Sequence, residues 1–476
     1  MAFIPWRLGA TAGAAMLLAG CATVDIDRTL ADTGRLTAEV TQGAPLALAR
    51  TDAQRDERDR LASGLLAQPL GPAEAVQLAL ATSPAFQALL AQAWDAEARA
   101  ARGGRIANPV FSFERFRIAD ELEISRMLSF GLLDLLTLPQ RHALAQGRMA
   151  LARAELASSV VEHVSGVRQA WVRAVAAREV LGYARQVQES AEAAAELARR
   201  MQQAGNFNRL ERARQQAFYA DAAARLAIAS HAATAAREEL VRRLGLTPAQ
   251  ASALKLPERL PDVPASPRPV QSLTEQAMTQ RLDVQLARLQ LAQAGRAQGL
   301  DLLGALFDTE LGLRRETVFD NADGTRSTGR GFELSLRVPL FDWGGPLRAS
   351  MNAQSLAAAN GYEAVVRSAA SQLREAYSGY RTAWDLARHY REEVVPLRRT
   401  ISEENLLRYN GMLIGVFELL ADQREQVAAV QAAIEAQQQF WLADAALSAS
   451  LVGRPLGASP ITSSAAPAEA AAGGGH

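Results

Sequence analysis

Residues 332–340 read FELSLRVPL, and their alternation decides which kind of fold the rest of the chain can form. Successive side chains of an extended strand point to opposite sides, so every second residue shares a face. One face carries the apolar members Phe332, Leu334, Leu336, Val338 and Leu340, and the other carries Glu333, Ser335 and Arg337. An apolar face opposite a polar face is the pattern of a strand in a membrane barrel.

Three more stretches fit the same pattern. Leu306–Arg314 alternates in the same way, and Asn321-Ala322-Asp323-Gly324-Thr325 is a polar turn suited to a hairpin between the two stretches. Earlier in the chain, Asn108–Ser129 alternates less regularly, with apolar residues from Phe111 to Ile124 between charged ones. The sequence therefore predicts two hairpins, which means four strands per chain.

Long amphipathic helices follow each predicted hairpin. A helix from about Arg148 to Gln203 would be roughly 84 Å long at 1.5 Å per residue. In the second half a seam with steps of three and four is typical of a helix that packs on other helices. Its members are Tyr362, Val366, Ala369, Leu373, Ala376, Tyr380, Ala383 and Ala387. Pro396 should kink or break this helix, because it has no amide hydrogen to donate to the carbonyl four residues earlier.

The composition agrees with long, slim helices. Of the 476 residues, 49% are hydrophobic, mostly Ala and Leu, whereas aromatic residues make up only 6%. Lys plus Arg (51) equals Asp plus Glu (51), so no basic surplus exists to neutralise phosphates. Nucleic acid is therefore not an expected partner.

The N-terminus predicts export and lipidation. Arg7 precedes the short apolar run Leu8–Ala19, which is a secretory signal and is too short for a permanent membrane helix. Leu18-Ala19-Gly20-Cys21 resembles the bacterial lipobox, in which the cysteine is acylated and becomes the new N-terminus; the alternative is an ordinary signal peptide with a stray cysteine. Several acyl chains give stable anchoring. The residue after the cysteine is Ala22 and not Asp, which in lipoproteins of this kind implies sorting to the outer membrane.

The two halves of the chain repeat the same order of elements with a shift of roughly 200 residues. Leu122-Glu123-Ile124-Ser125 matches Phe332-Glu333-Leu334-Ser335, Leu244-Gly245 matches Val452-Gly453, and the turn at Ala204-Gly205 matches Gly411-Met412. We expect six segments: a signal peptide (1–20), a lipidated, extended N-terminal segment with short helices (21–70), a first repeat (71–250), a Pro-rich linker (251–270), a second repeat (271–455) and a disordered tail (456–476).

This plan resembles the TolC-like outer membrane efflux family, and more narrowly its lipoprotein members, some of which serve heavy-metal export. The resemblance rests on Arg408-Tyr409-Asn410, Phe417-Glu418-Leu419-Leu420 and Val338-Pro339-Leu340-Phe341-Asp342, on Gly344-Gly345 at the strand-to-helix junction, and on the duplication itself. It covers about Gly71 to Gly453. The sequence departs from the family at Met412, where glycine is usual, and at Ile414, where some members have an arginine that ties the closed tip.

The resemblance implies a mixed, mainly α fold and a homotrimer. Three chains would give four strands each to one transmembrane β-barrel in the outer membrane lipids, continued by an α-helical coiled-coil tunnel into the periplasm. It also implies the function of an exit duct in a tripartite efflux pump, with a periplasmic adaptor and an inner-membrane transporter as partners. No cofactor is expected besides the lipid on Cys21.

The resemblance places the tunnel entrance at the helix–helix turns. It assigns Glu211, Glu418 and Tyr409 to the constriction, and we expect the adaptor to contact Gly205, Asn206, Asn208, Met412, Leu413 and Gly415. For the glutamates a local alternative remains, because Asn208-Arg209-Leu210-Glu211 is also a plausible capping box. Tyr409 has an alternative role in packing the coiled coil.

No motif in the sequence indicates catalysis or metal binding. His142, His163, His231, His389 and His476 are scattered, with no pair at ligand spacing. An enzyme is therefore not expected. The main competing function is a lipid-anchored coiled-coil scaffold that bridges the envelope without conducting, and the apolar faces of the predicted strands favour the duct. The sequence does not indicate the exported substrate.

Overall fold

The computed structural model describes residues 24–269, 281–306, 309–320, 322–338 and 340–454. The predicted signal peptide, Cys21 and the predicted tail lie outside these residues. The helices are α2 (Ile26–Leu36), α3 (Ala38–Thr41), α4 (Asp52–Leu66), α5 (Pro72–Thr82), α6 (Pro84–Arg102), α7 (Leu132–Leu136), α8 (Leu138–Gln203), α9 (Arg209–Leu244), α10 (Pro248–Ala253), α12 (Leu282–Leu306), α13 (Gly345–His389), α14 (Val395–Asn410) and α15 (Val416–Leu451). A π-helical turn, η1 (Tyr390–Val394), joins α13 to α14.

Four strands form one antiparallel sheet in the order β1 (Val110–Ile118), β2 (Glu121–Gly131), β3 (Thr309–Asp320) and β4 (Thr325–Leu336). Both predicted hairpins and the mainly α fold class are therefore confirmed. β4 ends two residues before Val338, which was expected to continue it; the next residue, Pro339, has no amide hydrogen for a strand ladder.

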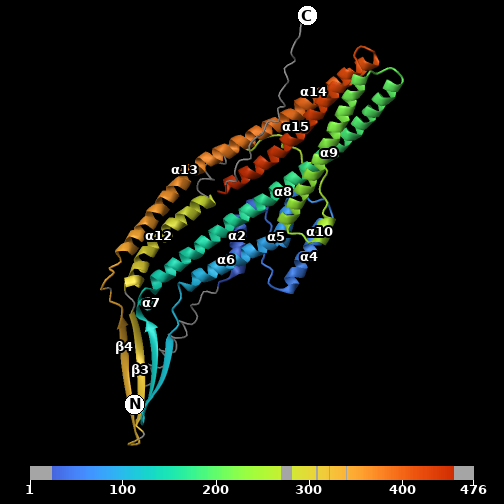
Figure 1. The fold of residues 1–476 in the computed structure, drawn as a ribbon. Coiled ribbons are helices and arrows are strands. Elements are labelled where there is room, and N and C mark those ends of the chain that lie inside the picture. The colour runs from blue at the N-terminus through green and yellow to red at the C-terminus, as the bar shows by residue number, and fades with distance from the viewer. Residues whose placement is uncertain (1–23, 270–280, 307–308, 321, 339, 455–476) are drawn as a thin grey trace. The chain divides into compact units, whose positions relative to one another are not determined.

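The chain divides into two compact units. Unit 1 contains Met1–Thr29, Leu90–Leu156 and Asp283–Arg367, so it holds the sheet, and unit 2 contains Leu30–Leu89, Ala157–Leu282 and Ser368–His476. Within unit 1, the ends of the strands opposite the hairpin turns connect to α6, α7, α12 and α13 (Figure 1). The units cut across the repeats, because each repeat contributes strands to unit 1 and a helix pair to unit 2.

The expected duplication is visible in the lengths of the long helices. α8 has 66 residues and α9 has 36, and in the second half Gly345–Asn410 and α15 have the same lengths. Both boundaries of each segment recur 207 positions later. Leu240 and Leu447, which are equivalent at this offset, are both fully buried.

The joint after each helix pair also repeats. Gly245 ends α9 with a φ of +69°, and a Cβ there would lie 2.5 Å from Pro84 Cδ, so only glycine fits against the start of α6. Gly453, with a φ of +90°, follows α15, and the amide of Leu282 at the start of α12 donates to the Val452 carbonyl at 2.8 Å. The predicted match of the two glycines is confirmed.

Pro396 interrupts the second long helix, as expected, and does so without ending it. The hydrogen-bond pattern loosens to a π-turn at Tyr390–Val394, and Pro396 then lies in the first turn of α14. A proline is tolerated there because the first amides of a helix have no partner within it.

The Pro-rich linker is irregular, as predicted, and begins at Leu254, because α10 extends to Ala253. Indole groups hold it against unit 2: Trp384 donates to the Pro264 carbonyl and Trp441 to the Pro261 carbonyl, each at 2.9 Å. Near its end, the Arg268 guanidinium forms a 2.9 Å ion pair with Asp444.

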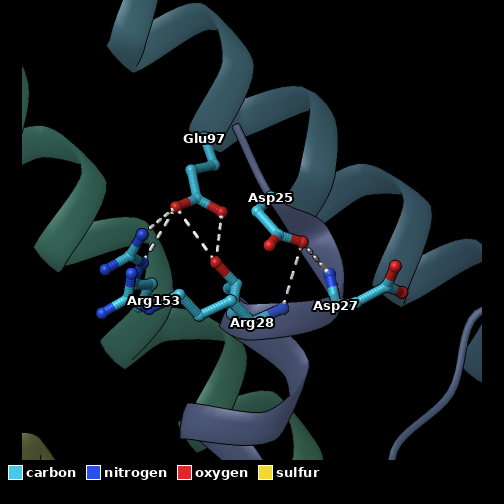
Figure 2. A network of polar contacts seen from close by, with 6 residues as sticks. Asp25, Asp27, Arg28, Glu97 and Arg153 are labelled. Atoms are coloured by element: carbon cyan, nitrogen blue, oxygen red, sulfur yellow. Dashed lines mark hydrogen bonds and ion pairs between the residues drawn. The ribbon is translucent and has the colours of Figure 1, made fainter. Parts of the chain in front are cut away.

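The segment between Cys21 and Leu70, expected to be extended with short helices, contains α2, α3 and the 15-residue α4. Figure 2 shows how the start of α2 is fixed in unit 1: Asp25 accepts from the amides of Asp27 and Arg28. The Thr29 hydroxyl donates to both oxygens of Glu97 on α6, at 2.8 and 3.1 Å. Glu97 also pairs with Arg153 of α8, and this buried carboxylate therefore ties α2 to two longer helices.

Candidate functional site

Two regions carry the residues that the sequence predicted to be functional: the turns between the long helices in unit 2, and the strand faces in unit 1. Both turns lie at the same end of unit 2 (Figure 1). The helices that follow them are in contact, because the Arg424 guanidinium of α15 lies over the Phe218 ring of α9, 4.7 Å from its centroid.

The two turns have the same backbone geometry. Asn206 donates to the carbonyl of Met201 and Leu413 to that of Arg408, both at 2.8 Å, which closes each helix with a six-residue hydrogen-bonded loop. The residue before each donor is in the left-handed conformation, with a φ of +82° at Gly205 and +59° at Met412. Met412 thus adopts a conformation that glycine adopts at lower cost.

Glu211 forms the capping box that the sequence allowed as an alternative. Its amide donates to Asn208 Oδ1 at 2.9 Å, and its carboxylate accepts from the Asn208 amide at 2.7 Å. Gly415 has nearly the same extended backbone as Asn208 but offers no side-chain cap, and Glu418 lies exposed in the first turn of α15. The local role is therefore confirmed for Glu211 alone, and the constriction role of Glu211 and Glu418 stays a prediction.

The remaining turn residues are placed where a partner could reach them. Met412 is 93% exposed and Leu413 is 74% exposed, and Asn206, Asn208 and Gly415 are also exposed. Tyr409 is half-buried in the last turn of α14. Two adjacent apolar side chains therefore lie exposed at the tip of the second helix pair.

Gln215 and Asp422 were not predicted, and they lie one helical turn after Glu211 and Glu418. Both side chains are buried, at 2% and 7% exposure. The Gln215 Oε1 and Asp422 Oδ2 atoms have no hydrogen-bond partner within the described residues. The only signal for them in the sequence is their equivalent place in the two repeats.

A half-buried ionic cluster of Arg168, Arg268 and Asp444 also lies in unit 2. Burial raises the pKa of the Asp444 carboxyl, and the two guanidinium groups oppose that rise. Arg168 donates to the Val40 carbonyl at 2.6 Å and Arg268 to the Ser448 hydroxyl at 3.2 Å. These bonds connect the N-terminal segment, the linker and α15. We therefore assign the cluster a structural role.

In unit 1, the strand register defines two faces of the sheet. Leu128, Leu313 and Phe332 are directly opposite one another on adjacent strands, so they share one face, which we call the apolar face. The opposite face, the acidic face, carries Glu114, Glu121, Glu123, Glu310, Glu316, Asp320 and Glu333. Among the strand residues of this face, Arg314 is the one arginine. Its guanidinium nitrogen lies 3.6 Å from a carboxylate oxygen of Glu123 and 3.6 Å from one of Glu316.

Apolar residues also follow the sheet where the chain returns to helix. Val338, Leu340, Phe341 and Trp343 are all more than half exposed, and Phe341 is 99% exposed. Aromatic residues at the edge of an apolar band are characteristic of a membrane–water interface.

No helix within the described ranges is long and apolar enough to cross a membrane. In the same ranges, no group of three or more His, Cys, Asp or Glu side chains is arranged to hold a metal ion.

No protein-family model matches the sequence, and no curated protein matches it. The structure is similar to that of the CmeC outer membrane channel of Campylobacter jejuni, with 15% identity and a TM-score of 0.65 over 84% of this chain and 86% of CmeC. It is similar to the outer membrane protein VceC of Vibrio cholerae, with 15% identity and a TM-score of 0.65 over 84% of this chain and 96% of VceC.

The MtrE outer membrane channel of Neisseria gonorrhoeae has 18% identity and a TM-score of 0.63, over 80% of this chain and 89% of MtrE. These similarities cover at least 86% of each of the three solved structures. The chain has the fold of TolC-like outer membrane channels.

Proposed function

We propose that this chain is the outer membrane exit duct of an efflux pump, acting as a homotrimer whose sheets close into one barrel. The observation that carries the proposal is the two-faced sheet: one face is apolar in the half nearer the helices, and the other face is lined by carboxylates. A closed barrel with lipid outside and water inside uses both faces. The described residues of one chain form only four strands, so closure requires other copies.

The periplasmic adaptor and the inner-membrane transporter belong to the same proposal, and the exposed turns at Gly205 and Met412 are the surface assigned to the adaptor.

Single-channel recording in planar bilayers tests the proposal. The purified trimer, recognised by its change in gel mobility on heating, should open conducting pores. Trimers that form but never conduct would instead support the lipid-anchored scaffold.

A pair of neighbouring residues gives a matched test of the sheet faces. Leu334→Asp places a charge on the apolar face, in the half nearer the helices, and should reduce membrane insertion. A charged side chain that faces lipid is destabilising, although Asp costs less than the about 2–4 kcal/mol of Arg or Lys at mid-membrane. Ser335→Asp places the same charge on the acidic face and should insert and conduct. Equal insertion of both variants would contradict the assignment of the faces.

A further inference from the structure

The charges of the two sheet faces are separated by sign. On the apolar face, the charged strand residues are all arginines: Arg115, Arg117, Arg126, Arg315, Arg326 and Arg330. Carboxylates within the strands are confined to the acidic face. None of the six arginines forms an ion pair with another described residue, although the Arg326 guanidinium lies over the Phe319 ring, 5.3 Å from its centroid.

These arginines are also confined to one half of the sheet. Arg126, Arg315 and Arg330 are directly opposite one another across β2, β3 and β4, and Arg115, Arg117 and Arg326 lie nearer the hairpin turns. The next cross-strand row on this face, on the side of Arg126, Arg315 and Arg330 that is nearer the helices, contains Phe111, Leu128, Leu313 and Phe332. The half of the apolar face nearer the helices is therefore uncharged, whereas in the other half arginines lie among apolar residues such as Phe113, Ile124 and Phe319.

Three like charges in adjacent cross-strand positions destabilise a sheet unless an anion lies between them, because opposite Cβ atoms are only about 4.5–5.5 Å apart. Guanidinium groups bind phosphate through two parallel hydrogen bonds. The helices connect to the end of the sheet opposite the arginine half. In a membrane barrel, the arginine half would therefore lie at the layer of lipid headgroups farther from the helices.

We propose that this arginine row binds the phosphorylated headgroup of a lipid in the outer leaflet, with the acyl chains of that lipid against Phe111, Leu313 and Phe332. The inference rests on the proposed function, since it takes the apolar face as the outside of a barrel. It adds a lipid of defined chemistry as a ligand: an amphiphile with phosphate groups beside its hydrocarbon.

The test uses the triple variant Arg126→Gln, Arg315→Gln, Arg330→Gln in the full-length trimer. The probes are neutral detergent micelles that contain lipid A with both phosphates, and micelles that contain the same lipid A after dephosphorylation. Bound lipid per trimer is measured by native mass spectrometry. A control triple variant, Arg60→Gln, Arg173→Gln, Arg225→Gln, removes the same charge from exposed positions on α4, α8 and α9.

Wild type and control should bind phosphorylated lipid A, with an affinity that falls as salt rises. The strand variant should bind it roughly a hundredfold more weakly, because each basic residue near a charged lipid surface contributes about a factor of five. All three proteins should bind the dephosphorylated lipid equally weakly.

Equal binding of phosphorylated lipid A by the strand variant and wild type would overturn the proposal. Equal binding of phosphorylated and dephosphorylated lipid A by wild type would overturn it as well. Displacement of the lipid by inorganic phosphate at the same concentration would also overturn it, since a free anion would then be the ligand. Conductance of the same preparations is recorded separately: a wild type that binds lipid A but never conducts would contradict the duct and leave the lipid site standing.

Discussion

Met412 is a methionine in a backbone conformation that glycine usually fills. Its φ of +59° brings Cβ close to the following carbonyl oxygen, which costs roughly 1 kcal/mol, whereas Gly205 in the other repeat has no such cost. The side chain is 93% exposed, so packing against this chain does not offset the strain. A strained residue at an exposed tip favours a role in contacting a partner.

Met412→Gly should therefore raise the free energy of unfolding by about 0.5–1 kcal/mol, because it relieves the strain at an exposed site. The thermal midpoint of the trimer, followed by circular dichroism, measures the change. Leu413→Gly is the control, since Leu413 has no positive φ and should gain nothing. A lower midpoint for Met412→Gly would mean that the methionine side chain makes stabilising contacts.

His163 links stability to acidity. Its ring stacks on Phe86 with 5.0 Å between centroids, and burial, assisted by the nearby Arg243, lowers its pKa from 6.5 to about 4. The folded chain holds the neutral ring, so the unfolded chain takes up the proton first as the pH falls. The stability that His163 contributes is complete above pH 6.5 and is lost progressively as the pH falls towards about 4.

His163→Phe should flatten the loss of thermal stability over this range, by on the order of 1–3 kcal/mol at the acid end. Melting curves across the range measure the effect. His231→Phe, at an exposed position on α9, should leave the acid sensitivity unchanged. Parallel curves for His163→Phe and wild type would show that other groups control the acid response.

The helix pairs are the elements through which the two turns act. Glu211 and Glu418 each lie in the first turn of a helix, but only Glu211 completes a capping box. Three chains would bring six such carboxylates to one mouth, where like charges drawn together favour cations. The capping and constriction roles predict different measurements.

Replacing both glutamates with Gln keeps the shape and part of the capping, so stability should fall by no more than about 1 kcal/mol. If the carboxylates form the constriction, cation preference should decrease and block by divalent ions added on the helical side should disappear. Some preference should remain from the acidic sheet face. Glu363→Gln with Glu403→Gln serves as the control, and unchanged block in the first variant would leave only the capping role.

The exposed turns give a separate prediction about docking. Asn206→Trp or Leu413→Arg should abolish export in cells while the trimer level stays normal, because both positions lie at the exposed tips assigned to the adaptor. Ser230→Trp, at an exposed position on α9, is the matched control. Full export by the turn variants would place docking elsewhere on the chain.

At the level of elements, the sequence predicted most of the architecture. Alternation located both hairpins, and the glycine matches located the ends of the helix pairs. The strand register could not be predicted, because it depends on hydrogen bonds between residues nearly 200 positions apart, such as Arg126 opposite Arg315. Arg115 and Arg117, or Arg326 and Arg330, show period-two spacing in the sequence, but only the register gathers them on one face.

Buried polar residues were also beyond the sequence pattern. Glu97 lies in a helix rich in Ala and resembles any surface glutamate in the sequence, yet it is 1% exposed because Arg153 and Thr29 neutralise and solvate it. The burial of Gln215 and Asp422 could not be predicted for the same reason. A buried polar side chain and a solvated one look alike in the sequence until the tertiary packing is known.

For the whole molecule, assembly and anchoring should be separable. The proposed barrel and the helix contacts do not depend on the acyl chains, so Cys21→Ala should leave a folded trimer and weaken only membrane attachment. The variant, exported with a non-lipoprotein signal, can be assayed by heat-dependent gel mobility and by washing of membranes. Failure to trimerise would show that the lipid takes part in assembly.

The fixed offset of 207 residues between the two helix pairs has a consequence for natural variation. An added or deleted residue within a helix rotates the rest of that helix by about 100° around its axis. The turn at its end then faces a different direction from the equivalent turn of the other repeat. A substitution leaves this orientation unchanged. Variants of this chain should accumulate substitutions mainly at the exposed positions of 138–244 and 345–451 outside the two turns. Insertions and deletions should be confined to the linker, the hairpin tips and the segments before and after the repeats.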